Sequence, residues 1–560
     1  MNTVIKSLFI FITLFSGLSA FAQTDQSVIS AIQKEVDRNK AELKMEGMVS
    51  PFFISYLVLD RYDYSLSASL GSISNYNESH QRRGLPTLLV GNYHRNNLKM
   101  QERNTYPSPT SLIENATGIP ISIWRDLDGF YKNAVESYQS KMAVLQQQTQ
   151  TDEEKNLPDF VQVKPVDMIM QPVPLNFNKT YWENYLRKAS ETAKQYPEIL
   201  SSNASLNARS IMSYTYNTEG SRYAVPYTFY QLTFTANTRA DDGQDLNLII
   251  YEENSTFEQM PDLATFTNKC KTMMENLLKL KKAPVMNDAY SGPVLFEGRA
   301  LYDLFVQVFI SNNKLAAAPK LVQLSQTPSY IIVNGVPQLA STQQGGNDFE
   351  LMLNKKVISR NLSIKSITGQ EFYKGQRLNG YYPVDAEGVV PDNELSLIDN
   401  GVLRNLLNGR KPTNKIRESN GHVRYDYNTN SFRTIPGNLL VTCNQTYNYD
   451  ELRKKLIEAA KEEDLEYAYI VKITTGGTNF FYKVYVDDGR EELVRGAAIS
   501  DATSLRPFKR ILGASNEEQI ESFSHIQTTI ISPNALLFEE MDVTRMPNID
   551  FKKPYIVQKP

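Results

Sequence analysis

Histidine and cysteine, the residues that build most zinc sites, are scarce in this sequence. Its 560 residues include only four histidines and two cysteines. The histidines are His80, His94, His422 and His525, and no two of them have the spacing of a metal-binding pair. A zinc centre built on a local histidine motif is therefore not expected.

The roles of individual histidines and cysteines can still be predicted. His80 lies beside two arginines, which indicates a solvated loop. His422 is the candidate catalytic histidine, and the simpler interpretation is that it supports a loop by hydrogen bonding. Cys270 lies on the apolar face of a predicted helix and Cys443 in a predicted strand. We interpret them as two separate buried thiols, and a disulfide in an oxidising compartment is the alternative.

The sequence also lacks an excess of charge of either sign and any long apolar run after its first residues. The formal net charge is -3, which gives no reason to expect nucleic acid as a partner. No later segment is apolar over the roughly 18 residues that a membrane helix needs. We therefore expect a protein without a membrane span, and 41% hydrophobic and 22% charged residues are ordinary for a globular chain.

The N-terminus has the pattern of a signal peptide. Lys6 provides a short positive region, and the apolar run Leu8–Leu18 is too short to span a bilayer. Ala20-Phe21-Ala22 is a small-x-small cleavage site, so residues 1–22 are predicted to be removed. The mature protein is then exported, either to a periplasm or to the outside of the cell, as a soluble protein.

The rest of the chain alternates helical and strand patterns, which predicts an α+β fold of largely antiparallel, twisted sheets with packed helices. A turn is predicted at residues 60–63, between strands over 52–59 and 64–73. Helices are predicted over residues 27–45, 126–148, 180–194 and 261–282. A proline-punctuated stretch near residue 165 suggests an N-terminal α+β domain (23–165), a middle α+β domain (166–290) and a C-terminal domain (291–560).

The stretch Ser291–Ser311, SGPVLFEGRALYDLFVQVFIS, is predicted to join a strand to a core helix. Gly292 and Pro293 suggest a turn, and Glu297 and Gly298 open the helix. Apolar residues at helical spacing then require a buried face. On this helix Arg299 and Asp303 either face a cleft or form a structural salt bridge. The following residues, 312–347, look irregular, as a lid or a disordered segment does.

This stretch resembles the core helix of the TldD/PmbA family, the metallopeptidase-like modulator-of-gyrase proteins. In the family's active branch the helix reads roughly LFHEVFGH, with two histidine ligands and a glutamate base. Here the residues read LFVQVFIS, with Val306 and Ser311 at the histidine positions and Gln307 at the glutamate position. Valine has no lone pair for a metal, and glutamine cannot accept a proton near neutral pH.

Further segments carry the same resemblance over most of the mature chain. A strand is followed by N-x-E-G at 217–220, and GYYPVDAEG at 380–388 is predicted as a strand. A hairpin with the turn Asp399-Asn400-Gly401 and the loop at 419–422 come next. A cysteine near the C-terminus is the family's third ligand, and no cysteine follows Cys443.

The resemblance implies a TldD/PmbA-like multi-domain architecture with a cleft for peptide or unfolded protein. It also implies a homodimer, or a heterodimer with a metal-bearing paralogue. Since the HExxxH-type motif is absent, this chain is expected to bind no metal or other cofactor and to be a non-catalytic subunit. Two alternatives stay open: an active peptidase with a displaced site, and a structural scaffold. Whether the chain is an enzyme is therefore not decided by its sequence.

Overall fold

The computed structural model describes most of the chain. The described residues are 27–100, 111–112, 118–175, 177–322, 330–333, 336–339, 348–427, 429–475, 478–500, 502–523 and 528–546. The predicted signal peptide and, within the predicted lid segment, residues 323–329, 334–335 and 340–347 lie outside them. Within the irregular segment, the described residues include the hairpin of β9 (Tyr330–Val333) and β10 (Val336–Leu339).

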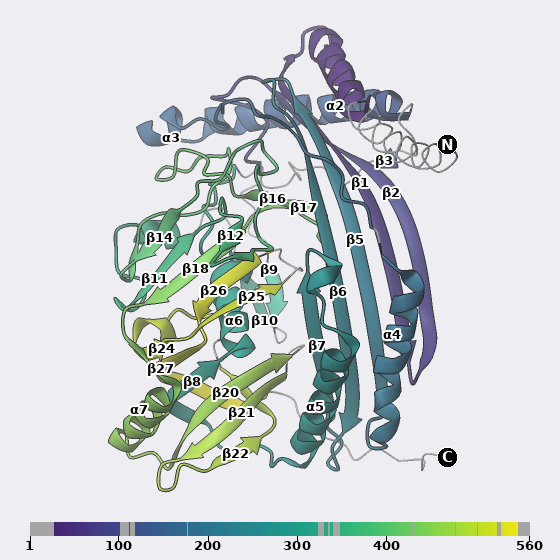
Figure 1. Cartoon of the computed structure of the whole chain (residues 1–560). Coiled ribbons are helices and arrows are strands. Elements are labelled where there is room, and N and C mark those ends of the chain that lie inside the picture. Colours follow the sequence, from purple (N-terminus) through teal and green to yellow (C-terminus); the bar gives the residue numbers. More distant parts are fainter. Residues whose placement is uncertain are drawn as a thin grey trace, which may run out of the picture.

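One long, curved sheet forms one side of the molecule (Figure 1). Its seven strands run in the order β3-β2-β1-β5-β6-β4, with β7 paired to β6. The strands are β1 (Pro51–Ser69), β2 (Ser72–Val90), β3 (Ser111–Leu112), β4 (Asp167–Ile169), β5 (Ser201–Asn217), β6 (Arg222–Arg239) and β7 (Asp245–Asn254). Strands from both the 23–165 and the 166–290 segments therefore share a single layer.

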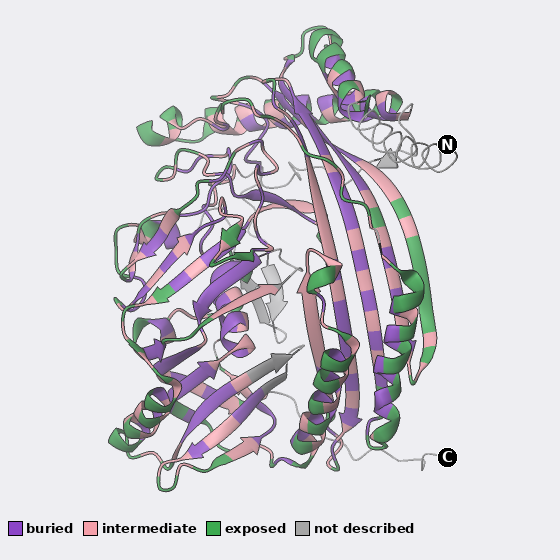
Figure 2. Cartoon of the chain, viewed as in Figure 1, coloured by how far each residue is buried: buried purple, intermediate pink, exposed green. Residues whose placement is uncertain are grey.

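Strict alternation along these strands gives the long sheet two different faces. In β5, Ala204, Leu206 and Ala208 are buried, whereas Ser205 and Asn207 between them are half-buried. Figure 2 shows these alternating bands of burial along the strands. Since successive side chains point to opposite faces, one face is apolar and the other is polar.

Helices cover the apolar face of the long sheet. A helix over residues 27–42 and α2 (Gly118–Gln147) pack on one end of that face. At the other end lie α4 (Lys179–Glu191), which continues as the 3₁₀ turn η1 (Thr192–Gln195), and α5 (Leu263–Lys282). The short helices α3 (Asp152–Asn156) and η2 (Phe257–Gln259) complete this part. Cys270 is a buried free thiol in α5.

The turn predicted at residues 60–63 is wrong, because β1 is continuous and turns only at Leu70-Gly71. Asp60 lies opposite Arg82 and accepts hydrogen bonds from it and from His80. Cross-strand pairs of opposite charge stabilise a strand, so these polar residues did not mark a turn. His80 accordingly lies in β2 rather than in a loop.

The remaining strands build a C-terminal lobe, residues 290–546, which faces the polar side of the long sheet (Figure 1). An eight-stranded sheet contains β8 (Tyr290–Glu297), β19 (Thr446–Tyr447), β20 (Tyr467–Thr475), β21 (Thr478–Tyr485), β22 (Glu491–Val494), β23 (Ala497–Ile499), β24 (Ile511–Ser515) and β27 (Ala535–Arg545). A six-stranded sheet contains β11 (Leu362–Ser366), β14 (Leu395–Asp399), β15 (Val402–Leu403), β18 (Asn438–Cys443), β25 (Glu518–Phe523) and β26 (Thr528–Pro533).

Helices and small hairpins complete the C-terminal lobe. They are α6 (Arg299–Phe305), the π-helix η3 (Val306–Ser311), α7 (Tyr449–Glu462), the 3₁₀ turns η4 (Asp348–Met352) and η5 (Pro507–Lys509), and the hairpins β12–β13 (Phe372–Tyr373, Gln376–Arg377) and β16–β17 (Val423–Asp426, Ser431–Thr434). The described helices include none that is long and apolar enough to cross a membrane. The predicted α+β class with largely antiparallel sheets is confirmed.

Two local predictions in this lobe are wrong. Gly292 and Pro293 lie inside β8, and the chain turns only at Gly298, whose φ of 58° suits a glycine. The predicted strand at 380–388 is a series of turns instead. Here Asp385 accepts hydrogen bonds from the backbone N–H groups of Glu387, Val389 and Val423, which fold the segment into a loop. By contrast, the turn at Asn400-Gly401 joins β14 to β15 as predicted.

The packing of α2 on the long sheet can be tested at Gly84. A methyl group at this position would overlap the buried ring of Tyr56, whose hydroxyl donates to Asp126 of α2. We expect Gly84→Ala to lower the free energy of unfolding by about 1–3 kcal/mol, since overpacking displaces the ring. Gly129→Ala in α2 is the control, because nothing surrounds that site and alanine should gain about 0.5–1 kcal/mol. Equal urea midpoints for the two variants would contradict this packing.

Candidate functional site

The residues at the family's motif positions lie where the core helix changes its geometry. After α6 the helix widens into the π-helix η3, which begins at Val306 and ends at Ser311. Val306 is half-buried against the core of the lobe, whereas Gln307 and Ser311 are exposed. Asn312 closes the last turn, since its Nδ2 donates to the Gln307 carbonyl at 2.6 Å. π-helical turns often occur at functional sites, and this one spans all three motif positions.

The side chains present at these positions do not fit the family's zinc. Zinc sites in proteins use cysteine, histidine or carboxylate ligands, and Val306 and Gln307 offer none. Throughout the described part of the chain, no group of three or more His, Cys, Asp and Glu side chains has the geometry of a metal site.

His422 lies away from the motif and is completely buried. Its Nε2 accepts a hydrogen bond from the Ser366 hydroxyl at 2.8 Å, and its Nδ1–H donates to Asn420 Oδ1 at 2.9 Å. Burial lowers the pKa of His422 to about 4, so the ring is neutral at physiological pH. Both nitrogens are used to hold the loop at 419–422, which leaves neither of them for a substrate.

Arg299 and Asp303 of α6 form a salt bridge that also includes Glu521 of β25. Arg299 Nε lies 3.1 Å from Asp303, and its Nη1 lies 3.3 Å from Glu521. Burial raises the pKa of Asp303 to about 6 and also raises that of Glu521. With a single arginine shared between two carboxylates, this group suits a structural role for the start of the core helix.

Two of the sequence segments that carry the family resemblance meet at one buried arginine. Arg410 donates from Nη2 to Glu219 of the N-x-E-G turn at 2.6 Å. Its backbone N–H donates to Glu387 of the 380–388 loop at 2.6 Å. The guanidinium is fully buried and lies 4.0 Å from the ring centre of Phe160. These segments therefore join the long sheet to the C-terminal lobe.

A cavity of about 390 Å³ lies between the polar face of the long sheet and the C-terminal lobe. Its walls are largely aromatic and apolar, with Arg424 as a buried cation 4.7 Å from the ring centre of Tyr382. The sheet contributes Leu57, Ser213, Thr215, Tyr223, Val225 and Tyr227, and the lobe contributes Tyr381, Tyr382, Pro383, Val384, Arg424, Tyr425 and Tyr427 among others.

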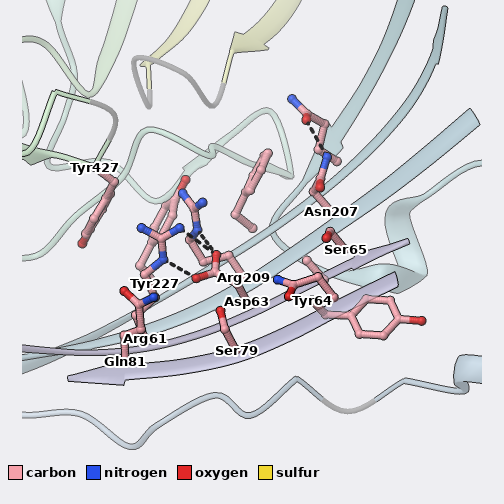
Figure 3. Close-up of a pocket in the computed structure, with 14 residues that line it drawn as sticks. Arg61, Asp63, Tyr64, Ser65, Ser79, Gln81, Asn207, Arg209, Tyr227 and Tyr427 are labelled. Atoms are coloured by element: carbon pink, nitrogen blue, oxygen red, sulfur yellow. Dashed lines mark hydrogen bonds and ion pairs between the residues drawn. The ribbon is translucent and has the colours of Figure 1, made fainter. Parts of the chain in front are cut away.

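A second cavity of about 410 Å³ lies beside the first on the polar face of the long sheet (Figure 3). Tyr227 and Tyr427 belong to the walls of both cavities, so the two are neighbours. The second cavity is lined mainly by hydroxyl, amide and guanidinium groups from β1, β2, β5 and β6. Sequence reasoning missed both cavities, because their walls come from segments far apart in the chain.

A wider cleft of about 1500 Å³ begins at the end of η3. Asn312, Asn313 and Lys314 form part of its wall, together with basic side chains from α2 and the 95–99 segment and acidic side chains from α3. Its buried Lys141 makes an ion pair with Asp159 at 2.5 Å and donates to two backbone carbonyls. Lys141 and Asp159 are thus paired within the protein.

The neutral state of His422 can be tested by its effect on stability. Its folded pKa lies below the ordinary value of 6.5, so the unfolded chain takes up the proton first as the pH falls. Above pH 6.5 the neutral ring therefore leaves the free energy of unfolding unchanged. As the pH falls from 6.5 to 4, burial of this ring lowers the free energy of unfolding by about 3 kcal/mol. We expect the difference in unfolding free energy between the wild type and His422→Gln to shrink over that range. A difference independent of pH would show that the histidine titrates normally.

The contact at Arg410 predicts a large loss of stability when its charge is removed. Arg410→Met leaves the carboxylate of Glu219 buried without its cation, which costs about 3–5 kcal/mol. Arg222→Ala removes the exposed pair with Asp167 and should cost less than about 1 kcal/mol. Denaturant unfolding of both variants measures the contrast. Similar small losses would mean that Arg410 does not hold the lobes together.

Comparison with known proteins agrees with this description. Residues 332–545 match the family profile of the PmbA/TldA metallopeptidase C-terminal domain. A search of curated proteins gave no match. Among solved structures, TldE from Thermococcus kodakarensis is 10% identical in sequence and has a TM-score of 0.53. The alignment covers 92% of this chain and 100% of the TldE chain.

Two proteins named as candidate modulators of DNA gyrase are similar as well. The protein from Thermotoga maritima MSB8 is 15% identical, with 92% of this chain and 100% of that chain covered and a TM-score of 0.55. The protein from Bacteroides thetaiotaomicron VPI-5482 is 12% identical, with 92% and 99% covered and a TM-score of 0.54. The predicted resemblance is confirmed: this chain has the TldD/PmbA fold over most of its length, and its residues 332–545 match the family's C-terminal domain.

Proposed function

We propose that this chain is an exported, non-catalytic protein of the TldD/PmbA type, which binds peptide between its two lobes or completes the active site of a partner. The observation that carries the proposal is the set of side chains on η3. Val306, Gln307 and Ser311 lie on the helix that carries the metal ligands and the general base in the family's active members. None of these three side chains is a zinc ligand or a general base.

The cavity of about 390 Å³ supports binding as the remaining task of the cleft. Its volume lies within the range of small-ligand sites, and its aromatic walls with one buried cation match their usual composition. An apolar side chain of a peptide would fill it and leave the peptide backbone in the cleft. A scaffold without a binding role would have no need for such a cavity.

A displaced peptidase site has less support. A general base must come within hydrogen-bond reach of the reacting group. His422 is buried and both of its nitrogens already have partners within the lobe. Its pKa of about 4 also makes it a weak base near neutral pH.

The predicted export and assembly belong to the same proposal. The signal-like residues 1–22 support export to a periplasm or beyond. The family resemblance supports a dimer, either with a second copy or with a metal-bearing paralogue. In the second case this subunit would supply binding surface and the paralogue the metal chemistry.

The first test is metal content and hydrolysis, measured on the mature chain purified without chelators. We expect less than about one tenth of a zinc per chain and no peptide hydrolysis that a chelator abolishes. The oligomeric mass should be determined in parallel. Near one zinc per chain together with chelator-sensitive hydrolysis would reject the non-catalytic proposal.

Binding itself is tested by filling the cavity of about 390 Å³ between the long sheet and the C-terminal lobe, the aromatic cavity. Ser213 of β5 lies in its wall, so Ser213→Phe would occupy the cavity and abolish binding of an unfolded, tyrosine-rich peptide. Ser201 is an exposed residue at the start of the same strand, and Ser201→Phe should bind as the wild type does. Calorimetric titration compares the three proteins. Equal affinities would show that the peptide does not use this cavity.

A further inference from the structure

The second cavity, of about 410 Å³, is the polar cavity. It contains a triad of charged side chains on the polar face of the long sheet. Asp63 of β1 lies between Arg61 of the same strand and Arg209 of β5 (Figure 3). Arg61 Nη2 donates to Asp63 Oδ1 at 2.9 Å, and Arg209 Nε donates to the same oxygen at 2.7 Å. The two arginines lower the pKa of Asp63 against the effect of its burial, so the triad carries a net charge of +1.

The terminal nitrogens of Arg209 have no partner among the described residues. Only its Nε is used, in the contact with Asp63, which leaves both Nη groups to face the cavity. Arg61 Nη1 is likewise without a partner in the described part of the chain. The arginine side chains are 29% and 26% exposed, so the donors are sheltered but can be reached. Such a sheltered, pre-positioned guanidinium fork favours a planar anion with two acceptors.

Amide side chains around the triad favour a ligand that has polar atoms besides its carboxylate. Asn77 and Gln81 of β2 and Asn207 of β5 add amide groups to the cavity wall. Tyr227 and Tyr427 close the side toward the aromatic cavity, with their rings stacked at a centroid distance of 5.9 Å. The polar cavity is therefore an extension of the proposed peptide cleft.

The register of the sheet gives the distance between the two cavities. Tyr227 of β6 lies opposite Ile211, and Arg209 is two residues away from Ile211 along β5. Two residues of a strand span about 7 Å. An extended peptide with its apolar side chain in the aromatic cavity would thus bring the second residue along to the arginines.

We propose that the Arg61–Asp63–Arg209 triad selects peptides that carry a carboxylate about two residues from an apolar or aromatic side chain. The carboxylate is either that of an aspartate or glutamate or the C-terminal carboxylate of the peptide. Arg209 would bind it through both Nη groups, and Arg61 would add a third donor. This inference rests on the proposed function, since it names the class of peptide that the cleft accepts.

The test uses the mature protein and three acetylated peptides with the core Tyr-Gly-X. In the first, X is aspartate and the C-terminus is amidated; in the second, X is asparagine, also amidated; in the third, the chain ends at X, a glycine, as a free acid. We expect the aspartate or the free-acid peptide to bind about tenfold more tightly than the asparagine peptide, which is the ordinary contribution of one charged hydrogen-bonded contact. Whichever of the two binds more tightly identifies the source of the carboxylate.

Two substitutions in the triad should act in opposite directions. Arg209→Ala should remove the tenfold preference, whereas Asp63→Asn should increase it, since a negative charge beside the ligand disappears. A residue with a merely structural role would weaken binding in both variants. Arg239→Ala, which removes an exposed ion pair at the far end of β6, is the matched control and should keep the wild-type preference. Circular dichroism and melting temperature verify that every variant is folded.

The outcomes separate this inference from the proposed function. Equal binding of the aspartate, free-acid and asparagine peptides by the wild type overturns the inference and leaves peptide binding intact. No binding of any peptide overturns both. The amide groups and tyrosines would also suit a sugar, so tetragalacturonate serves as a second probe. Binding of tetragalacturonate that Arg209→Ala abolishes, without binding of peptides, would overturn the peptide proposal in favour of an acidic saccharide.

Discussion

One buried guanidinium group ties the two lobes together. Arg410 belongs to the C-terminal lobe, yet it donates to Glu219 and to the carbonyl of Val161, which lie in the long sheet and in the segment that leads to it. Charge without access to water is stabilised only by hydrogen bonds and counter-charges, so neither lobe can move away without leaving an unpaired ion in the interior. This contact therefore helps to hold the lobe opposite the polar sheet face, where both cavities lie.

Segments that resemble the family thus divide into two physical roles. The turn at Glu219 and the loop at Glu387 shape the interface around Arg410, and they need no catalytic chemistry to do so. The core helix has the other role, because its π-helical end places positions 306, 307 and 311 at the boundary of the core. With valine, glutamine and serine there, the packing of the helix is retained while its capacity for ligation is not. In the proposed non-catalytic protein, the fold is kept without the metal chemistry because different residues carry the two functions.

The sequence predicted the class of the fold and the helices, because hydrophobic periodicity reports local structure well. It failed where polar or turn-forming residues were satisfied by distant partners. Asp60 suggested a turn, but Arg82 on the neighbouring strand pairs with it inside β1. Gly292-Pro293 suggested a turn, but both lie within β8. The motif positions could be found from the sequence, whereas Asp63 and Arg209, 146 positions apart, meet only through strand pairing. No local pattern contains such a site.

The polar cavity has a simple origin in the geometry of long strands. A strand that alternates strictly must put every second side chain on the face away from the helices, and in β1, β2 and β5 these are mainly Ser, Asn, Gln, Asp and Arg. Such a face would ordinarily be covered by water. Here the C-terminal lobe shelters it at Tyr427, so a polar surface becomes the wall of a cavity. Charge in a sheltered wall binds a counter-charge more strongly than it would on an open surface, because fewer water molecules screen it. The selectivity of the cleft for a carboxylate would then be a consequence of how the two lobes meet, without any contribution from the motif positions on η3.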